Sequence, residues 1–450
     1  MGSKWVTTTL GDIALGRDGA VDGPFGSNLP ASCYQDVGIP VVRGSNLSVG
    51  LGEFKDDGFV YVSDSTFDKL SRSECKVGDI VFTKKGTLGQ TGLITSEHKF
   101  DRYLLSSNQM RLRVDPTKAI SEYVYFCVSS KKTILKLIKD SESTGVPKIN
   151  LAYLKSIQIE LPSIEIQKEI IGHLGALNSK ITLNNQINQT LEQMAQTLFK
   201  SWFVDFDPVK AKMNGEQPKG MDAVTAALFP EKLVESELGL IPEGWEIHKT
   251  QDLFDVKDGT HDSPKKAEEG HYLVTSKHIT KGKIDTSSAY QISDADFEKV
   301  NQRSKVDTFD ILLTMIGTVG EVVVVYDNPV EFAIKNVGLF KTSQKPELVW
   351  LFYWHLQSFK MKHYLEARMA GTTQQYLTLK TLRTIPVVLP SDELLAKFNE
   401  VMSPLMEKIS DNHKQSHTLS NLRDTLLPKL LSGEIDLENL QVEQANALAE

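Results

Sequence analysis

The side chains in this sequence that are best suited to recognition chemistry lie in short polar loops, which occur in two sets about 230 residues apart. Within each pair of loops the flanking residues align, whereas the polar tips differ. The paired loops are 22–28 and 258–263, 43–46 and 275–278, 84–85 and 315–316, 107–109 and 335–336, and 144–148 and 371–375. Arginine and lysine suit anionic groups, while asparagine and glutamine amides present a donor and an acceptor side by side. Different tips on one shared frame predict two binding surfaces with different preferences.

The spacings typical of catalytic centres are missing from the sequence. It contains no Gly-x-x-x-x-Gly-Lys-Ser/Thr phosphate loop, no Gly-x-Ser-x-Gly elbow and no His-Glu-x-x-His metal motif. The segment Asn328-Pro329-Val330 lacks the second proline and the aromatic residue of an amino-methyltransferase motif. Carboxylates near Lys210 and Lys212 suggest a nuclease core, but they fall in a segment with the composition of a connector. We therefore expect no catalytic residue, no metal ligand and no cofactor in this chain.

The frame that positions the loops is itself duplicated. Gly-Asp-Ile-Val-Phe-Thr-x-x-Gly-Thr-x-Gly at 78–89 returns as Phe-Asp-Ile-Leu-Leu-Thr-x-x-Gly-Thr-x-Gly at 309–320. This period is far longer than that of a solenoid, so it indicates two whole domains. Strands are expected at 39–43, 79–82, 109–114, 272–275, 311–314 and 321–326, helix-compatible stretches at 121–139 and 348–367, and closing strands at 157–161 and 384–389. The sequence predicts an α+β fold with two similar globular domains, each a mixed β-sheet with helices.

A long helical pattern follows each domain. Apolar residues recur at steps of three and four, at Leu174, Leu177, Ile181, Leu191, Met194, Leu198 and Trp202, and again at Met402, Leu405, Ile409, Leu419, Leu422, Leu426 and Leu430. Polar residues interrupt both stripes at the same depth, at Asn184, Asn185 and Asn188, and at Asn412, His413 and Ser416. Matching interruptions predict that the two helices pair in a fixed register. The alternative is two unrelated amphipathic helices, each packed on its own domain.

These patterns predict an order of parts along the chain. The expected parts are a first recognition domain at 1–163, a long helix at 164–206, a connector at 207–244, a second domain at 245–391, a second long helix at 392–433 and an acidic tail at 434–450.

The formal net charge is −8, but much of the acidity lies at the C-terminal end. Residues 391–450 carry 5 basic and 11 acidic side chains. Because neither globular part is strongly basic, a polyanion such as DNA would bind weakly to this chain alone, with a basic partner neutralising many phosphates.

Three observations bear on the compartment. Cys33, Cys75 and Cys127 have no metal-ligand spacing and are expected to be reduced, partly buried thiols. The N-terminus lacks the apolar stretch of a signal peptide. The most apolar segment, 311–326, has the pattern of two strands around a turn rather than of a membrane span. We expect a cytoplasmic protein.

Three strings in the sequence resemble one family closely. Residues 198–208 read Leu-Phe-Lys-Ser-Trp-Phe-Val-Asp-Phe-Asp-Pro, residues 238–245 read Leu-Gly-Leu-Ile-Pro-Glu-Gly-Trp, and residues 422–435 read Leu-Arg-Asp-Thr-Leu-Leu-Pro-Lys-Leu-Leu-Ser-Gly-Glu-Ile. With the order of parts, they resemble the DNA-specificity (S) subunits of type I restriction-modification systems over essentially the whole chain.

The resemblance implies that each globular copy is a target recognition domain for one half of a bipartite DNA site. The long helices would pair antiparallel and fix the gap between the half-sites. Two modification subunits, which bind S-adenosylmethionine and methylate adenine, would dock on this chain, together with restriction subunits that use ATP and Mg. Because the loop tips of the two copies differ, the site should be asymmetric.

The residues expected to contact DNA are those of the paired loops. In the first copy they are Phe25, Ser27, Asn28, Arg43, Ser45, Asn46, Lys84, Lys85, Thr87, Asn108, Gln109 and Lys148. In the second copy they are Thr260, His261, Thr275, Lys277, His278, Thr318, Lys335, Asn336, Thr372, Thr373, Gln374 and Gln375. Two other functions stay open: a self-contained methyltransferase or nuclease of unfamiliar type, and a coiled-coil scaffold with no role in nucleic-acid binding.

Overall fold

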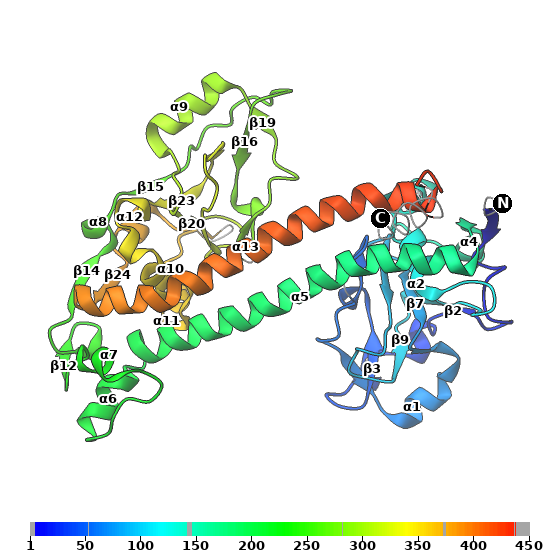
Figure 1. The fold of residues 1–450 in the computed structure, drawn as a ribbon, viewed down its shortest axis with the longest axis horizontal. Coiled ribbons are helices and arrows are strands. Elements are labelled where there is room, and N and C mark those ends of the chain that lie inside the picture. Colours follow the sequence, from blue (N-terminus) through cyan, green and yellow to red (C-terminus); the bar gives the residue numbers. More distant parts are fainter. Residues whose placement is uncertain are drawn as a thin grey trace, which may run out of the picture. The chain divides into compact units, whose positions relative to one another are not determined.

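The computed structural model describes residues 5–52, 54–141, 146–280, 282–371 and 375–435, together with Leu437. The chain forms two compact units, residues 1–184 with 414–450, and residues 185–413. Two 40-residue helices, α5 (Ile164–Phe203) and α13 (Asp392–Leu431), each contribute residues to both units (Figure 1).

The first unit contains two larger sheets. One has the order β2 (Ala20–Asp22), β10 (Gln109–Arg113), β7 (Asp79–Thr83), β8 (Gln90–Leu93) and β4 (Ser48–Val49), and every neighbouring pair in it is antiparallel. The other has the order β5 (Val60–Val62), β3 (Ile39–Val42), β9 (Arg102–Leu105) and β6 (Glu74–Lys76), with β3 and β9 parallel. Val42, Val81 and Tyr103 from the two sheets share one buried cluster. Helix α1 is Asp64–Lys69 and α4 is Leu151–Ser156.

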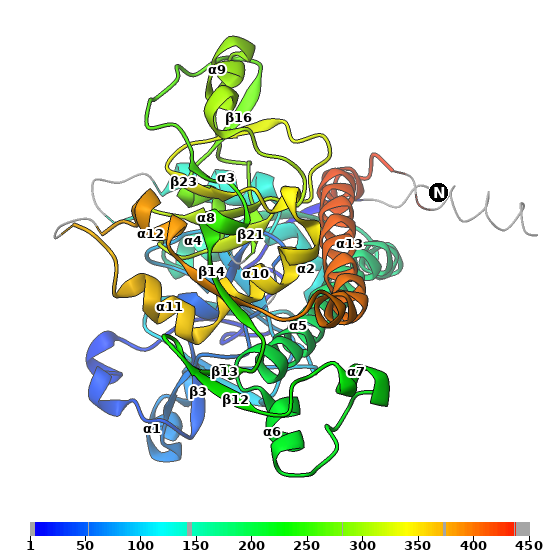
Figure 2. The ribbon, with the colours of Figure 1, turned by 90° about the vertical axis from the view of Figure 1, so that its left-hand side faces the viewer.

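The second unit repeats this arrangement. Its first sheet has the antiparallel order β15 (Val256–Asp258), β23 (Val337–Phe340), β20 (Ile311–Thr314) and β21 (Val322–Val324). Its second sheet is β19 (Gln291–Ile292), β16 (His271–Val274) and β22 (Phe332–Ile334), with β16 and β22 parallel. Figure 2 shows α9 (Asp294–Ser304) next to β16. The unit also contains the small elements α8 (Thr250–Leu253), β17 (Ile279–Thr280), β18 (Lys283–Ile284) and α12 (Leu379–Arg383). The predicted α+β duplication, with mixed sheets, is confirmed.

Each predicted helical stretch after the sheets forms two helices rather than one. In the first unit α2 (Ser121–Val128) and α3 (Lys131–Asp140) are separated at Ser130, whose side chain accepts a hydrogen bond from Thr133 N. In the second, α10 (Val349–Gln357) and α11 (Phe359–Glu366) are separated at Ser358, which accepts from Met361 N. A serine hydroxyl that caps a new helix competes with continuation of the old one. Both stretches expected to be helix-compatible are therefore helical, and each is interrupted once by a capping serine.

The closing strand of each domain pairs with its opening strand. In the first unit β11 (Gln158–Leu161) is antiparallel to β1 (Val6–Thr9), and in the second β24 (Pro386–Leu389) is antiparallel to β14 (Glu246–Lys249). Each long helix begins within a few residues of its closing strand. These ladders therefore tie the start of each helix to the entry of its domain.

The two long helices pair through buried amides, as predicted. In the second unit Asn412 Nδ2 donates to Asn188 Oδ1 at 2.8 Å, and Asn188 Nδ2 donates to the carbonyl of Ile409 at 3.1 Å. In the first unit Asn184 Nδ2 donates to Gln415 Oε1 at 2.8 Å. Higher numbers on α5 meet lower numbers on α13, so the helices run antiparallel within each unit. Buried amide pairs favour one register over others, and the alternative of two unrelated helices is wrong.

Two residues of the predicted apolar stripes are about half exposed. Met194 is 52% exposed, whereas the adjacent Ala195 is buried, and Leu422 is 46% exposed. Steps of three and four residues average about 3.5, whereas a straight helix has about 3.6 residues per turn. The apolar stripe therefore rotates slowly around the helix, and some of its residues become exposed. Met194 and Leu422 occupy equivalent positions in the two copies, so the same departure occurs twice.

The segment predicted as a connector is folded. It contains α6 (Asp207–Met213), α7 (Ala223–Ala227) and the hairpin β12 (Leu233–Ser236) with β13 (Gly239–Pro242). Phe229 is buried against Trp202 with ring centroids 5.1 Å apart, and Trp245 lies 5.6 Å from Phe203. These aromatic side chains bury the segment against the end of α5.

Among the described residues, no helix is long and apolar enough to cross a membrane. The apolar segment 311–326 forms strands β20 and β21, as predicted. All three cysteines are free thiols, and Cys75 and Cys127 are buried.

His355 should make the second unit sensitive to acid. Its Nε2 lies 2.8 Å from the carbonyl oxygen of Pro386, joining α10 to β24, and burial lowers the pKa of His355 to about 4. In the unfolded chain the pKa is about 6.5, so the unfolded state binds more protons between these values. Stability should fall as the pH drops from about 6.5 towards 4, by at most about 1.4 kcal/mol per pH unit. Urea unfolding at several pH values would measure this slope. His355→Gln retains a donor and should flatten the slope; an unchanged slope would assign it to other groups.

Candidate nucleic-acid interface

The predicted loops of the first unit meet at one end of the five-stranded sheet. Because neighbouring strands are antiparallel, the ends of β2 and β7 lie beside the starts of β10 and β8. Backbone hydrogen bonds connect the loops there: Gly23 N donates to Gln109 O at 2.9 Å, and Lys84 N donates to Asn108 O at 2.9 Å. Loops distant in sequence therefore form one surface.

An open hollow of about 450 Å³ lies at this end of the sheet. Six predicted residues line it: Arg43, Ser45, Lys85, Thr87, Asn108 and Gln109. Tyr34, Gly44, Thr83, Gln90, Ser106 and Ser107 complete the lining, so the described residues around the hollow include two cations and no carboxylate. Such a surface attracts anions and presents amide and hydroxyl groups for hydrogen bonding.

A further predicted residue, Lys148, lies beside the hollow. Lys148 forms a β-bridge with Lys85, and Ile149 N donates to Lys84 O at 2.9 Å. The two lysines at the loop tip differ, since Lys84 Nζ is 3.0 Å from Asp22 Oδ1 whereas Lys85 is exposed. Part of the charge of Lys84 is thus balanced within the protein, and Lys85 is the better candidate for a contact with DNA.

Lys85→Ala should weaken DNA binding more than Lys84→Ala does. Loss of one phosphate contact lowers the salt dependence of binding by about one unit of slope, whereas loss of a base contact relaxes one half-site only. DNA duplexes would be titrated at several salt concentrations with this chain assembled with its expected modification subunits. The affinities and their salt dependence would measure both effects. Equal losses for the two variants would show that the pairing of Lys84 with Asp22 does not matter.

Three predicted residues are buried and hold the loops in place. Asn46 Oδ1 accepts from Arg43 N at 3.0 Å, and His278 Nδ1 accepts from Thr275 N at 2.9 Å, at equivalent places in the two copies. Burial, with Lys277 beside it, lowers the pKa of His278. Gln109 accepts a hydrogen bond from Ser106 Oγ. These hydrogen bonds give the three side chains a role in positioning the loops. Their contacts with DNA stay predictions, and Gln109 also lines the hollow.

In the second unit the predicted residues meet at the corresponding end of the sheet. Thr260 and Lys335 form a parallel bridge, and Asn336 N donates to Thr260 O at 3.2 Å. His261 Nδ1 lies 2.8 Å from Asn336 Oδ1, and Lys335 Nζ contacts Ser263 Oγ. Thr275 opens the neighbouring turn.

The remaining predicted residues lie at loop tips. Phe25, Ser27, Asn28, Lys277, Thr318 and Gln375 are exposed, and Gln375 precedes Tyr376, which bridges Ile316. Thr372, Thr373 and Gln374 lie outside the described residues, as does most of the predicted acidic tail.

Sequence reasoning missed Gln90 and Tyr34, both of which line the hollow. Gln90 Oε1 accepts from Thr83 Oγ1 at 3.1 Å, which leaves the amide nitrogen as a donor. Gln90 follows the Gly-Thr-x-Gly turn directly, where the second copy has Glu321. This difference in chemistry at an aligned position was the available signal.

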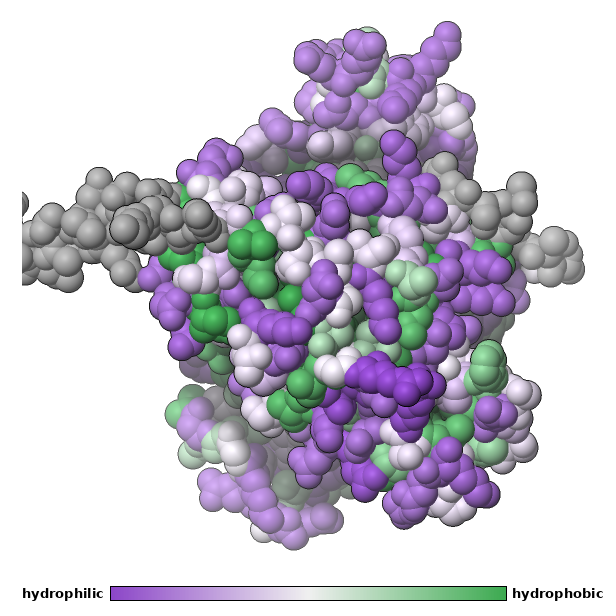
Figure 3. Space-filling view, turned by 90° about the vertical axis from the view of Figure 1, so that its right-hand side faces the viewer, coloured by the Kyte–Doolittle hydropathy of each residue, from purple (hydrophilic) through white to green (hydrophobic). Residues whose placement is uncertain are grey.

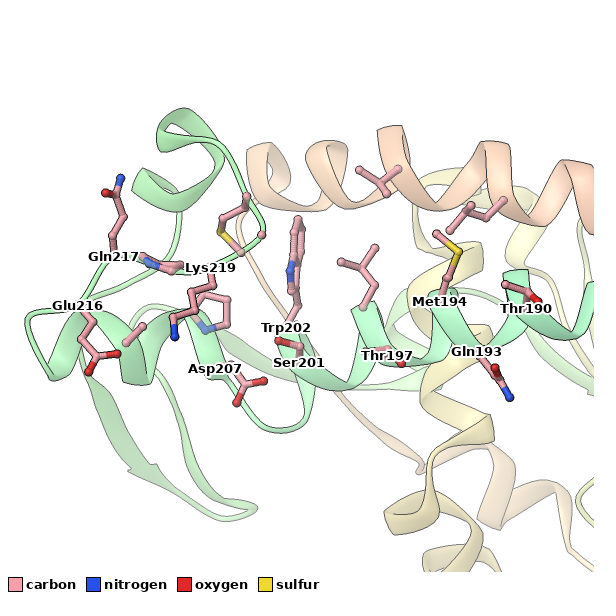
Figure 4. Close-up of a pocket in the computed structure, with 18 residues that line it drawn as sticks. Thr190, Gln193, Met194, Thr197, Ser201, Trp202, Asp207, Glu216, Gln217 and Lys219 are labelled. Carbon is pink, nitrogen blue, oxygen red and sulfur yellow. The ribbon is translucent and has the colours of Figure 1, made fainter. Parts of the chain in front are cut away.

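A second hollow, of about 740 Å³, lies in the second unit at the end of α5 (Figure 4). Met194, Leu198 and Trp202 from α5 line it together with Asp207 and Glu216 from the connector. No three His, Cys, Asp or Glu residues in the described part of the chain are grouped to hold a metal ion. Figure 3 shows a largely hydrophilic face of the first unit, with scattered hydrophobic groups.

Comparison with known proteins gives consistent matches along the chain. A family model described as the type I restriction modification DNA specificity domain matches residues 3–193 and 242–421. The specificity subunit of the type I restriction enzyme HindI from Haemophilus influenzae is 25% identical, over 96% of this chain and 100% of that protein. The MjaIX specificity subunit from Methanocaldococcus jannaschii is 27% identical over 85% of each chain. The crystal structure of a type I restriction-modification S subunit from M. genitalium aligns with a TM-score of 0.54 and 16% identity, over 95% of this chain and 96% of that chain, which shows a shared fold.

Proposed function

Because this chain belongs to the type I restriction modification DNA specificity family, we propose that each of its units reads one half of an asymmetric bipartite DNA site. The observation that carries the proposal is the convergence of the polar loops at the same end of the sheet in each unit, on one frame with different tips. The paired helices, about 60 Å long, exceed the roughly 34 Å between half-sites one helical turn apart. We propose that the paired helices fix the distance between the two half-sites.

We also propose that this chain recognises DNA without catalysing a reaction. The absence of catalytic spacings in the sequence supports this role. S-adenosylmethionine, ATP and Mg would then be bound by partner subunits. The alternative, a self-contained methyltransferase or nuclease, is not favoured, because the family match accounts for both halves of the chain as specificity domains.

The proposed partners are two modification subunits, joined by restriction subunits in a complex that cleaves DNA. Met194 and Leu422, about half exposed, are equivalent in the repeat and give each unit an accessible apolar position on a long helix. Leu198 and Leu426, one turn further along, are partly buried in both copies. Two equivalent surfaces favour two copies of the same partner. The acidic net charge of this chain also favours a partner that supplies positive charge. The cytoplasmic location remains a prediction.

The experiment that tests the function uses this chain assembled with its modification subunits. Sequencing of methylated adenines in cells that express the complex would give the target site. The complex should then retain a duplex with that site in competition with random DNA. Replacing the sequence of either half-site should abolish this preference for the site over random DNA. Methyl transfer by the pure chain with S-adenosylmethionine, without a partner, would refute a non-catalytic role.

A further inference from the structure

An aromatic ring occupies the same loop position in both units. Phe25 follows Asp22 and Gly23 by two residues, and His261 follows the aligned pair Asp258 and Gly259 by two residues. Phe25 is 81% exposed, and the side chain of His261 is 62% exposed. A phenylalanine this exposed is unusual in a loop that is otherwise tied closely to the sheet.

The backbone that presents each ring is fixed against the sheet. A Cβ atom on Gly23 would lie 1.9 Å from the carbonyl oxygen of Ser106, and one on Gly259 would lie 2.5 Å from that of Ile334. Only glycine permits this approach. Since Ser106 lines the hollow of the first unit, Phe25 projects from a loop that packs on the wall of that hollow.

The chemistry of the two rings narrows what they can do. Phe25 has no polar side-chain atom, so it cannot read the hydrogen-bonding edge of a base, but it can stack on a base or insert between two bases. His261 is held in one plane, because its Nδ1 lies 2.8 Å from Asn336 Oδ1 and its Nε2 lies 3.1 Å from Asp258 Oδ2. Arg303 is paired with the same Asp258.

We propose that Phe25 and His261 are the stacking residues of the two half-sites. Phe25 acts as an apolar wedge that opens one base step beside the hollow, and His261 stacks with a fixed orientation in the other half-site. Cations and amides around the hollow, Arg43, Lys85 and Gln90, hold the backbone and edges of the opened step. The inference rests on the proposed function, since it requires that these loops contact DNA.

The test places 2-aminopurine at successive positions in a duplex that carries the methylation-defined site, bound by the assembled complex. The fluorescence of this base analogue rises when it is unstacked. We expect a rise at one position of the first half-site with the unmodified chain, loss of the rise with Phe25→Ala and retention with Phe25→Leu. Phe25→Ala should also lower affinity about tenfold, by loss of one stacked base. His261→Ala should weaken only the other half-site, and His261→Phe should restore it.

Val37→Ala is the matched control. Val37 is 74% exposed in the same unit, but it lies before the start of β3, whereas the loop at 43–46 follows the end of that strand. If the unmodified complex does not distinguish its site from random DNA, the proposed function fails. If it does, but Phe25→Ala changes neither the fluorescence nor the affinity, the stacking role alone is overturned. Loss of modification subunits from the Phe25→Ala complex, with unchanged DNA binding by what remains, would make Phe25 a protein contact and also overturn the proposal.

Discussion

Asp79→Ala is expected to lower the free energy of unfolding of the first unit by about 3–5 kcal/mol. Asp79 is fully buried, and its carboxylate accepts from Arg113 Nε at 2.8 Å, from Arg113 Nη2 at 2.7 Å and from Lys76 N at 3.0 Å. Arg111 lies 3.9 Å away and is 4% exposed, and its burial lowers the pKa of its guanidinium. Without Asp79 the buried guanidinium of Arg111 would lack its counter-charge. The resulting loss in the free energy of unfolding should exceed the contribution of an ion pair on the surface.

Hydrogen exchange of the amides in β7 and β10 would measure this loss in the first unit alone, since a chain of two units need not unfold in one step. Asp18→Ala is the control, because Asp18 pairs with Arg72 at 3.4 Å on the surface and should matter by less than about 1 kcal/mol. Similar protection in the two variants would mean that water or a backbone shift replaces Asp79. Asp310 holds the equivalent place in the second unit, paired with the buried Lys341.

Met194→Glu and Leu422→Glu together are expected to prevent assembly with the modification subunits. Both side chains are apolar and about half exposed, and glutamate suits an α-helix, so the fold should be retained. Burying an unpaired carboxylate in an apolar interface costs several kcal/mol, which corresponds to a loss of affinity of at least about a hundredfold. Mass photometry of the mixed subunits should show one modification subunit with either single variant and none with the double variant.

Gln186→Glu introduces the same charge on α5 at an exposed residue that does not line the hollow at the end of that helix, and it should leave assembly unchanged. If the double variant still recruits two modification subunits, the partner docks elsewhere on the chain. If Gln186→Glu is as damaging as Met194→Glu, the charge acts at long range rather than by contact.

The repeat and the periodicity of the chain were enough to predict the architecture. Strands β7 and β20 follow directly from the repeated Asp-Ile segment, and the interrupted apolar stripes predicted the amides that join α5 and α13. Local patterns of this kind survive folding, because each element must bury one face whatever the rest of the chain does.

The details of the candidate interface could not be predicted in the same way. Asn46 and Ser45 are neighbouring polar residues in one turn, yet Asn46 is buried to close that turn and Ser45 lines the hollow. Gln90 joins the surface because the start of β8 lies beside the end of β7, a consequence of strand pairing. The breaks at Ser130 and Ser358 depend on a hydroxyl capping the next helix, which competes closely with helix continuation.

By itself the sequence determined that this protein has two copies of one frame, joined by helices that pair, with different polar tips and no catalytic spacing. Only the tertiary structure decided which of those polar side chains face outward, and that Phe25 and His261 share one exposed position. The physical reason is that periodicity records whether a face is buried, which is a local property. The direction of a loop side chain instead depends on which backbone groups need a partner once distant strands have paired.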